Sequence, residues 1–211
     1  MEAREAIMNT FIDTVVQRYN DNVTIWDVVN EAFEDDGTYR NSVWYEAMGE
    51  DYIRKAFVRA RASAPNAQLL YNDYDVGISG AKSDAMYELM QELLASGTPI
   101  DGVGFQMHVK SDFNQLDEVA VNLQRFADLG LDVYITELDV AMQEGDTQEQ
   151  QAEVFAGVLS TCLAQPACKA TQIWGFTDRY SWLNDANALI LTEDYQAKPA
   201  YEALQGVLAN Q

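Results

Sequence analysis

The chain has 211 residues, 48% of them hydrophobic, and carries a formal net charge of -21. This composition is typical of a globular domain with a sizeable core and excludes a disordered chain. The acidic surplus argues against nucleic acid and against an anionic membrane surface as partners, because both bind basic patches. No apolar stretch reaches the roughly 20 residues of a membrane span, and a neutral polysaccharide suits this charge better as a ligand.

Helical and strand patterns alternate along the chain. In chain order they predict a helix at residues 4–19, a strand at 23–29, a helix at 44–64, a strand at 68–72, a helix at 83–95, a strand at 100–107, a helix at 116–129, a strand at 131–138, a helix at 147–163, a strand at 170–176 and a helix at 198–208. Strands that are separated by helical crossovers run parallel.

Five parallel strands with six helices indicate an α/β fold, either a doubly wound sheet or part of a TIM (β/α)8 barrel. The phosphate loops GxGxxG and GxxxxGK[ST], which would favour the doubly wound sheet, do not occur. Polar and aromatic residues stand where the strands end, as in a barrel active site: Asn30-Glu31, Asn72-Asp73, Gln106-Met107-His108, Glu137 and Trp174. We therefore expect a partial barrel whose missing strands lie upstream.

Two of these strand ends carry glutamates. Glu31 and Glu137 each follow an apolar, β-branched strand, and a carboxylate at such a place is costly without a partner or a task. A pair of carboxylates that converge from separate strands is what glycoside hydrolysis requires.

Five segments, in order, resemble motifs of family 10 glycoside hydrolases, the (β/α)8 endo-β-1,4-xylanases. They are Trp-Asp-Val-Val-Asn-Glu at 26–31, Tyr-Asn-Asp-Tyr at 71–74, Gly-Val-Gly-Phe-Gln-Met-His at 102–108, Ile-Thr-Glu-Leu-Asp at 135–139 and Trp-Gly-Phe-Thr-Asp-Arg-Tyr-Ser-Trp at 174–182. The resemblance covers essentially the whole chain and starts at the family's third helix. It implies one catalytic domain at 1–211, equivalent to the carboxy-terminal part of the barrel.

The resemblance also implies roles. Glu31 corresponds to the general acid/base and Glu137 to the nucleophile of a retaining reaction, in which the two carboxyl groups lie about 5–5.5 Å apart. Asn30 corresponds to a residue that binds the sugar 2-hydroxyl. His108, with Asp139 behind it, is expected to orient Glu137. Gln106 would support the same network.

Four further residues are expected to bind substrate. Trp174 and Trp182 are candidate sugar platforms, with core packing as the alternative. By resemblance Tyr74 lines the reducing-side subsite, and Asn72 bonds within the pocket or has a structural role. We expect no cofactor and no metal, because solvated loops are the better interpretation of the acidic clusters at 35–36 and 144–146.

Cys162 and Cys168 are separated by five residues, which does not fit zinc-ligand spacing. They are either a small-loop disulfide or two reduced thiols. The pair resembles a disulfide of many secreted family members, so an extracellular location is expected, with the signal peptide outside this chain.

The leading hypothesis is a retaining endo-β-1,4-xylanase that acts on xylan or xylo-oligosaccharides. The alternatives are a catalytically impaired or dead barrel fragment that binds polysaccharide, and a β-glycosidase of altered specificity. Because residues 23–29 and 170–176 would form open sheet edges, we expect a homodimer or higher oligomer that covers them.

Overall fold

The structure is a computed structural model that describes residues 2–210. One parallel sheet runs through it in the order β1-β2-β3-β5-β4, and β6 also pairs with β5. The strands are β1 (Ile25–Asn30), β2 (Gln68–Asp73), β3 (Gly102–Phe105), β4 (His108–Lys110), β5 (Asp132–Ala141) and β6 (Cys168–Ile173). Because, among the described residues, β1 pairs only with β2 and β6 only with β5, the sheet is an open part of a barrel, as predicted.

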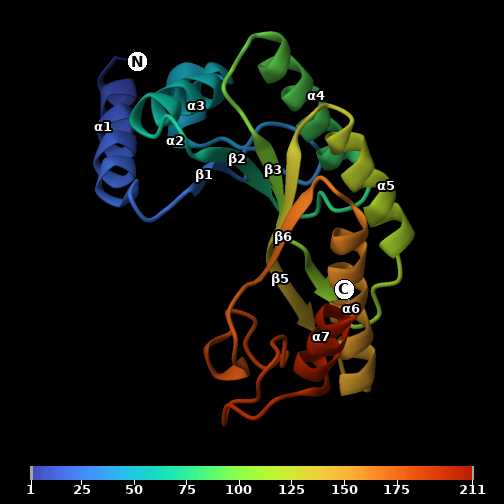
Figure 1. Ribbon diagram of the computed structural model, residues 1–211. Helices are drawn as coiled ribbons and strands as arrows, with labels where there is room; N and C mark the ends of the chain where they lie inside the picture. The colour runs from blue at the N-terminus through green and yellow to red at the C-terminus, as the bar shows by residue number, and fades with distance from the viewer. Residues whose placement is uncertain (1, 211) are drawn as a thin grey trace.

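Seven α-helices connect and flank these strands. They are α1 (Glu2–Tyr19), α2 (Val43–Met48), α3 (Asp51–Ser63), α4 (Ala81–Ala95), α5 (Leu116–Ala127), α6 (Gln148–Ala164) and α7 (Pro199–Ala209), with a short 3-10 helix η1 (Asp178–Tyr180) after β6. Figure 1 shows α4, α5 and α6 in succession along one side of the sheet, and α1 to α3 near β1.

Two elements differ from the sequence prediction. The helix expected at 44–64 is divided into α2 and α3, because Gly49 ends α2 with a left-handed φ of 61°. The strand expected at 100–107 ends at Phe105, and a short strand, β4, follows after Met107, whose φ is 63°. The division of that helix and the additional strand β4 give six strands and seven α-helices within residues 2–210, against the expected five and six.

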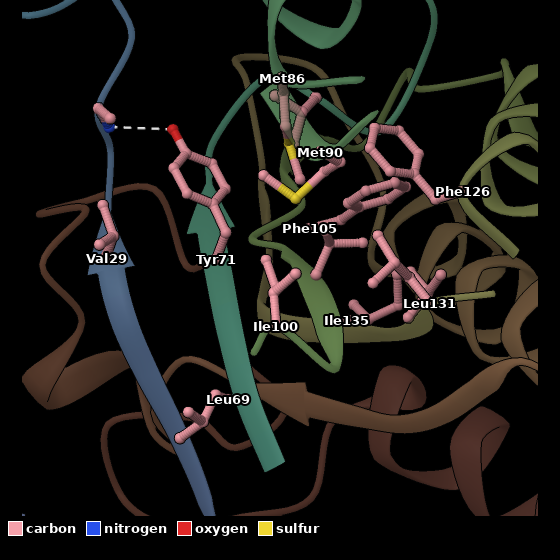
Figure 2. Packing of buried hydrophobic residues seen from close by; sticks show 14 of the residues in the cluster. Val29, Leu69, Tyr71, Met86, Met90, Ile100, Phe105, Phe126, Leu131 and Ile135 are labelled. Carbon is pink, nitrogen blue, oxygen red and sulfur yellow. Dashed lines mark hydrogen bonds between the residues drawn. The ribbon is translucent and has the colours of Figure 1, made fainter. Parts of the chain in front are cut away.

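The core lies between the middle strands and the helices. Figure 2 shows Phe105 of β3 beside Phe126 of α5, with Met86 and Met90 of α4 close by. The two phenylalanine rings meet edge-on at 5.4 Å between centroids, and both residues are fully buried. Burial of one such side chain contributes roughly 1.5–3 kcal/mol to folding. This packing fixes β2, β3 and β5, whose carboxyl ends form the site.

The first helix packs differently from its sequence pattern. The helical pattern of 4–19 places Ile7, Phe11, Ile12, Val15 and Val16 on one side, but Ile7 and Phe11 are 60% and 67% exposed. Val16 of that set is buried, as is Met8. Ion pairs from α1 to α3, such as Lys55 with Glu5 at 2.7 Å, orient α1 in this way.

Cys162 and Cys168 are joined in a disulfide, in agreement with the first of the two interpretations. The bond links the last turn of α6 to the first residue of β6.

Within residues 2–210, none of the helices combines the length and the apolar character that crossing a membrane requires.

Candidate active site

The carboxyl ends of three neighbouring strands carry strained backbone. Glu31, Asp75 and Met107 have φ values of 55°, 54° and 63°, and they follow β1, β2 and β3. Residues other than glycine rarely adopt this left-handed conformation, and such outliers concentrate at functional sites. The strained residues therefore indicate that this end of the sheet is a candidate functional site.

A cavity of about 570 Å³ opens at these strand ends. Its walls are formed by Asn30, Glu31, Tyr74, Asp75, Gln106, His108, Glu137, Trp174 and Trp182. Eight of these nine residues were predicted from the sequence, and Asp75 is the addition. A second cavity of about 570 Å³ shares Asp75 and His108 with the first and extends along residues 107–115. The two cavities together form an elongated cleft.

A chain of side-chain amides connects the two glutamates. The Asn72 Nδ2 group donates to Glu137 Oε1 at 2.7 Å and to Asn30 Oδ1 at 2.9 Å. Gln106 Nε2 donates to the same Asn30 oxygen at 3.2 Å and to Glu31 Oε1 at 3.1 Å. Because Asn72 and Gln106 are buried, this chain is shielded from water and fixes the relative positions of the two carboxylates.

Close backbone approach at Gly104 makes room for this chain. A Cβ atom at residue 104 would overlap the Asn72 amide oxygen and come within 2.8 Å of the Thr136 methyl group. The Asn72 oxygen accepts a hydrogen bond from the Thr136 hydroxyl at 2.7 Å. A side chain at this position of β3 would therefore displace Asn72 from Glu137.

Glu31 is held from both sides. Gln106 donates to Oε1, and Arg40 Nη1 donates to Oε2 at 2.8 Å. Partial burial acts to raise the pKa of Glu31, but the hydrogen bonds from Gln106 and Arg40, together with the Arg40 charge, outweigh it and lower the pKa. In this arrangement the ionised carboxylate is the favoured form.

Glu137 is more deeply placed, with its side chain 12% exposed. Besides Asn72, it has His108 as a neighbour, whose Nε2 lies 3.3 Å from Oε2. The other ring nitrogen of His108 lies 3.0 Å from Asp139 Oδ2. Trp182 Nε1 donates to that same Asp139 oxygen at 2.7 Å, so the tryptophan also contacts this network.

Burial acts to lower the pKa of His108, but the Asp139 carboxylate, and Glu137 after it, raise the pKa above its usual value. A charged His108 would thus lie between two carboxylates. The arrangement suits the predicted role of His108 and Asp139 in orienting Glu137.

The predicted aromatic residues occupy the walls of the cleft. Trp174 and Trp182 are 45% and 55% exposed, so neither is a core residue and both offer a face to a ligand. The Tyr74 hydroxyl donates to Asp35 at 2.7 Å, and burial followed by this bond raises its pKa to about 12. Asn72 does not line the cavity but reaches it through Glu137.

Arg40 and Asp75 were missed by the sequence reasoning. Arg40 lies on a loop nine positions after Glu31, where no periodicity marks it. Asp75 follows Tyr74 at a strand end, and that position could have identified it.

As for metals, residues 2–210 contain no group of three or more histidine, cysteine or acidic side chains suited to hold an ion. In the acidic clusters, Asp36 accepts hydrogen bonds from Thr38, and Asp146 accepts one from the Gln143 backbone.

Comparison with known proteins gives a consistent result. The family model described as glycosyl hydrolase family 10 matches residues 1–207. Endo-1,4-beta-xylanase B of Thermotoga neapolitana is 43% identical over 96% of this chain, and endo-1,4-beta-xylanase 1 of Humicola insolens is 38% identical over 97%. The chain spans only 61% and 50% of the lengths of these two relatives.

Solved structures agree. Native xylanase 10B of Thermotoga maritima superposes with a TM-score of 0.95 at 44% identity, covering 99% of this chain and 67% of that one. Xylanase 10B of Thermotoga petrophila in complex with xylobiose superposes with a TM-score of 0.92 at 44% identity, covering 96% of this chain and 64% of that one. The open sheet therefore corresponds to about two thirds of these proteins.

Proposed function

Since the chain belongs to glycosyl hydrolase family 10, we propose that it is a retaining endo-β-1,4-xylanase that cleaves internal bonds of xylan or xylo-oligosaccharides. The observation that carries this proposal is the convergence of Glu31 and Glu137 on one cleft, connected by the amide chain through Asn72, Asn30 and Gln106. Two fixed carboxylates are the minimal machinery of this reaction. The xylobiose bound by the Thermotoga petrophila relative supports the substrate class.

In the first step, Glu137 attacks the anomeric carbon while Glu31, in its protonated form, gives its proton to the departing glycosidic oxygen. The carbon–oxygen bond breaks and a glycosyl ester forms on Glu137. In the second step, Glu31 takes a proton from water, and the resulting hydroxide attacks the anomeric carbon and frees Glu137. The bond from Asn72 and the contact with His108 hold the nucleophile in line.

The test is reducing-sugar release from xylan by the purified chain, its Glu137→Gln and Glu137→Ala variants, and a Glu153→Gln control on an exposed position of α6. We expect hydrolysis in the wild type and the control and its loss in both Glu137 variants. A 2-fluoro-xylobioside with a good leaving group should lose that group and add the mass of its 2-fluoro-xylobiosyl group to Glu137. Hydrolysis that survives in Glu137→Ala would contradict the proposal.

A second candidate function is polysaccharide binding without turnover. The observation in its favour is that the sheet is open beside the cleft while Trp174 and Trp182 stay exposed. In that case, xylohexaose would bind to the wild type and less to Trp174→Ala, and no sugar would be released by either. Calorimetry on the two proteins, beside the hydrolysis assay, separates binding from catalysis.

We further propose that self-association covers the free edges of β1 and β6, and that the protein works in an oxidising, extracellular environment. The exposed backbone edges and Ile25, which is 41% exposed, support the first point. The disulfide supports the second. Sedimentation that gives a single compact monomer at micromolar concentration would refute self-association.

A further inference from the structure

A buried lysine lies next to the cleft and has no part in the proposed reaction. Lys82, in the first turn of α4, is 3% exposed, and its Nζ lies 2.8 Å from Asp73 Oδ1. The same ammonium group lies 2.9 Å from the centre of the Tyr74 ring. A desolvated cation against an aromatic face is attracted more strongly than an exposed one, so this contact can fix the position of the ring.

Asp73, the carboxylate that pairs with Lys82, is itself held in place. Asp73 is fully buried at the end of β2, and it accepts hydrogen bonds from the Tyr71 hydroxyl at 2.6 Å and from the Tyr74 backbone at 2.9 Å. An ammonium group paired with such a carboxylate cannot move without leaving a buried charge unpaired. Lys82 therefore holds the Tyr74 ring in one place.

From Tyr74 the contacts continue to Glu31. Arg40 Nη2 donates to the Tyr74 hydroxyl at 3.0 Å, while Nη1 of the same guanidinium donates to Glu31 Oε2 at 2.8 Å. The planar guanidinium can make both bonds at once only if the tyrosine hydroxyl and the carboxylate keep their spacing. Glu34 competes weakly for Arg40, with its Oε2 at 3.6 Å from Nε.

We propose that Lys82 is a positioning residue for Glu31, acting through Tyr74 and Arg40. This inference rests on the proposed role of Glu31 as acid/base and deepens it. No atom of Lys82 reaches the cavity wall, so it acts only through the other two residues.

The chemical consequence concerns when Glu31 can donate a proton. The first step needs a protonated Glu31, whereas Arg40 favours the ionised form. The other groups that face Glu31 come from the neighbouring strand ends: Asn30 and Gln106 by hydrogen bonds, and Tyr74, Asp75, His108 and Glu137 across the shared cavity. With these unchanged, the position of Arg40 decides at which pH the acid is available.

The experiment measures the titration of the Glu31 carboxyl by ¹³C NMR on the whole chain labelled in its glutamate side chains, with Glu31→Gln to assign the signal. Three variants interrupt the path at successive points: Arg40→Met, Tyr74→Phe and the double change Lys82→Met with Asp73→Asn. The double change removes both buried charges, so that neither is left unpaired.

The chain offers a matched control. Arg125 stacks on the Tyr87 ring at 4.0 Å and pairs with Asp84 at 2.6 Å, so it repeats the cation, ring and carboxylate arrangement on the outer side of α4 and α5. None of these three residues lines the cleft. Arg125→Met should leave the Glu31 titration where it is in the wild type.

We expect the Glu31 pKa to rise in all three path variants, by about one unit or more in Arg40→Met and by less in the other two. A rise in Arg40→Met alone would overturn the proposal, because Arg40 would then hold its place without Lys82. An unchanged pKa in Arg40→Met would overturn it as well. If the double variant does not fold, Tyr74→Phe decides, since an unshifted pKa there excludes the path.

This titration needs no turnover, so the proposed role of Lys82 can be tested even if the chain fails to hydrolyse xylan. If the chain is active, the pH at which hydrolysis falls on the alkaline side should move upward in the same three variants. Failure of the proposed function would appear as a lack of xylan hydrolysis by the wild type, whereas failure of this inference would appear as an unshifted Glu31 titration in the variants.

Discussion

The middle and the edges of the sheet differ in how they hold their functional residues. In β2 and β5 nearly every residue is buried, whereas β1 and β6 are mostly exposed or partly covered, with Val29 of β1 as the buried exception. Glu137 stands in β5, while Glu31 and Trp174 directly follow the two edge strands. Glu137 thus belongs to a buried strand that pairs with buried β3 on one side and with β6 on the other, whereas Glu31 and Trp174 stand in the loops after their strands.

This difference suggests why a partial barrel can keep one of the two glutamates proposed as catalytic in order more easily than the other. Glu137 takes its hydrogen bond from Asn72, a residue of the packed sheet. Glu31 depends on Arg40 from a loop and on Gln106 across the sheet end. The variants described next test this difference between the middle and the edges of the sheet.

The largest effect should follow from Glu31→Gln. Loss of general acid catalysis typically slows a reaction by about 10²–10⁴-fold. We expect that loss on xylan, and a much smaller loss on an aryl xyloside whose phenol departs without a proton. Steady-state kinetics on both substrates check this. Equal losses would mean that Glu31 binds substrate and does not protonate it.

The next largest effect should be on the free energy of unfolding, which we expect to differ between the middle and the edge of the sheet. Phe105→Ala removes a fully buried ring of the middle strands and should cost about 3–5 kcal/mol in the free energy of unfolding. Ile25→Ala, on edge strand β1, should cost less than about 1 kcal/mol, because that side chain is 41% exposed. Urea unfolding of both variants measures the difference. Similar costs would show that the edge is covered in solution.

The disulfide should have a moderate effect that is confined to an edge. It attaches the start of β6 to α6, so the double change Cys162→Ser and Cys168→Ser should loosen that strand. Closure of so short a loop is worth about 2 kcal/mol. Hydrogen exchange should rise in β6 and stay unchanged in β2. A uniform rise across the sheet would contradict the division into middle and edge.

The smallest effect concerns pH. Because its neighbouring carboxylates raise the pKa of His108, the protonated ring is favoured in the folded state. Its stabilising contribution is complete below the usual value of about 6.5 and is lost as the pH rises through the raised value. The free energy of unfolding of wild type minus His108→Gln should therefore decline between pH 5 and pH 9. A difference that does not change with pH would show that His108 stays neutral.

The sequence predicts the site well because parallel strands end at one side of a sheet. Glu31, Gln106, His108 and Glu137 could be placed together from their positions after apolar runs, and the structure brings them to one cavity. Their catalytic roles stay predictions. What the sequence could not supply depends on tertiary contacts. Arg40 stands on a loop without periodicity, and its use is decided by where Tyr74 and Glu31 meet it.

Tertiary structure also explains why the bounds of some predicted elements were wrong. The left-handed turn at Met107 shortens the strand expected at 100–107 and lets the separate strand β4, which the sequence did not predict, begin at His108. The exposed Ile7 and Phe11 of α1 show the converse, because their helical pattern is clear and yet no described residue buries them.

Gly104 has a consequence for anyone who wishes to redesign this cleft. The space beside its Cα is filled by the Asn72 amide, and that amide in turn bridges Asn30 and Glu137. The exposed tryptophans at the rim leave space beside their rings, so a change of side chain there need not displace the sheet. Residue 104 has no such space, because a single methyl group there would displace the Asn72 amide and with it the position of Glu137 relative to Asn30. A residue without a side chain thus limits how far the positions of Asn72 and Glu137 can be altered.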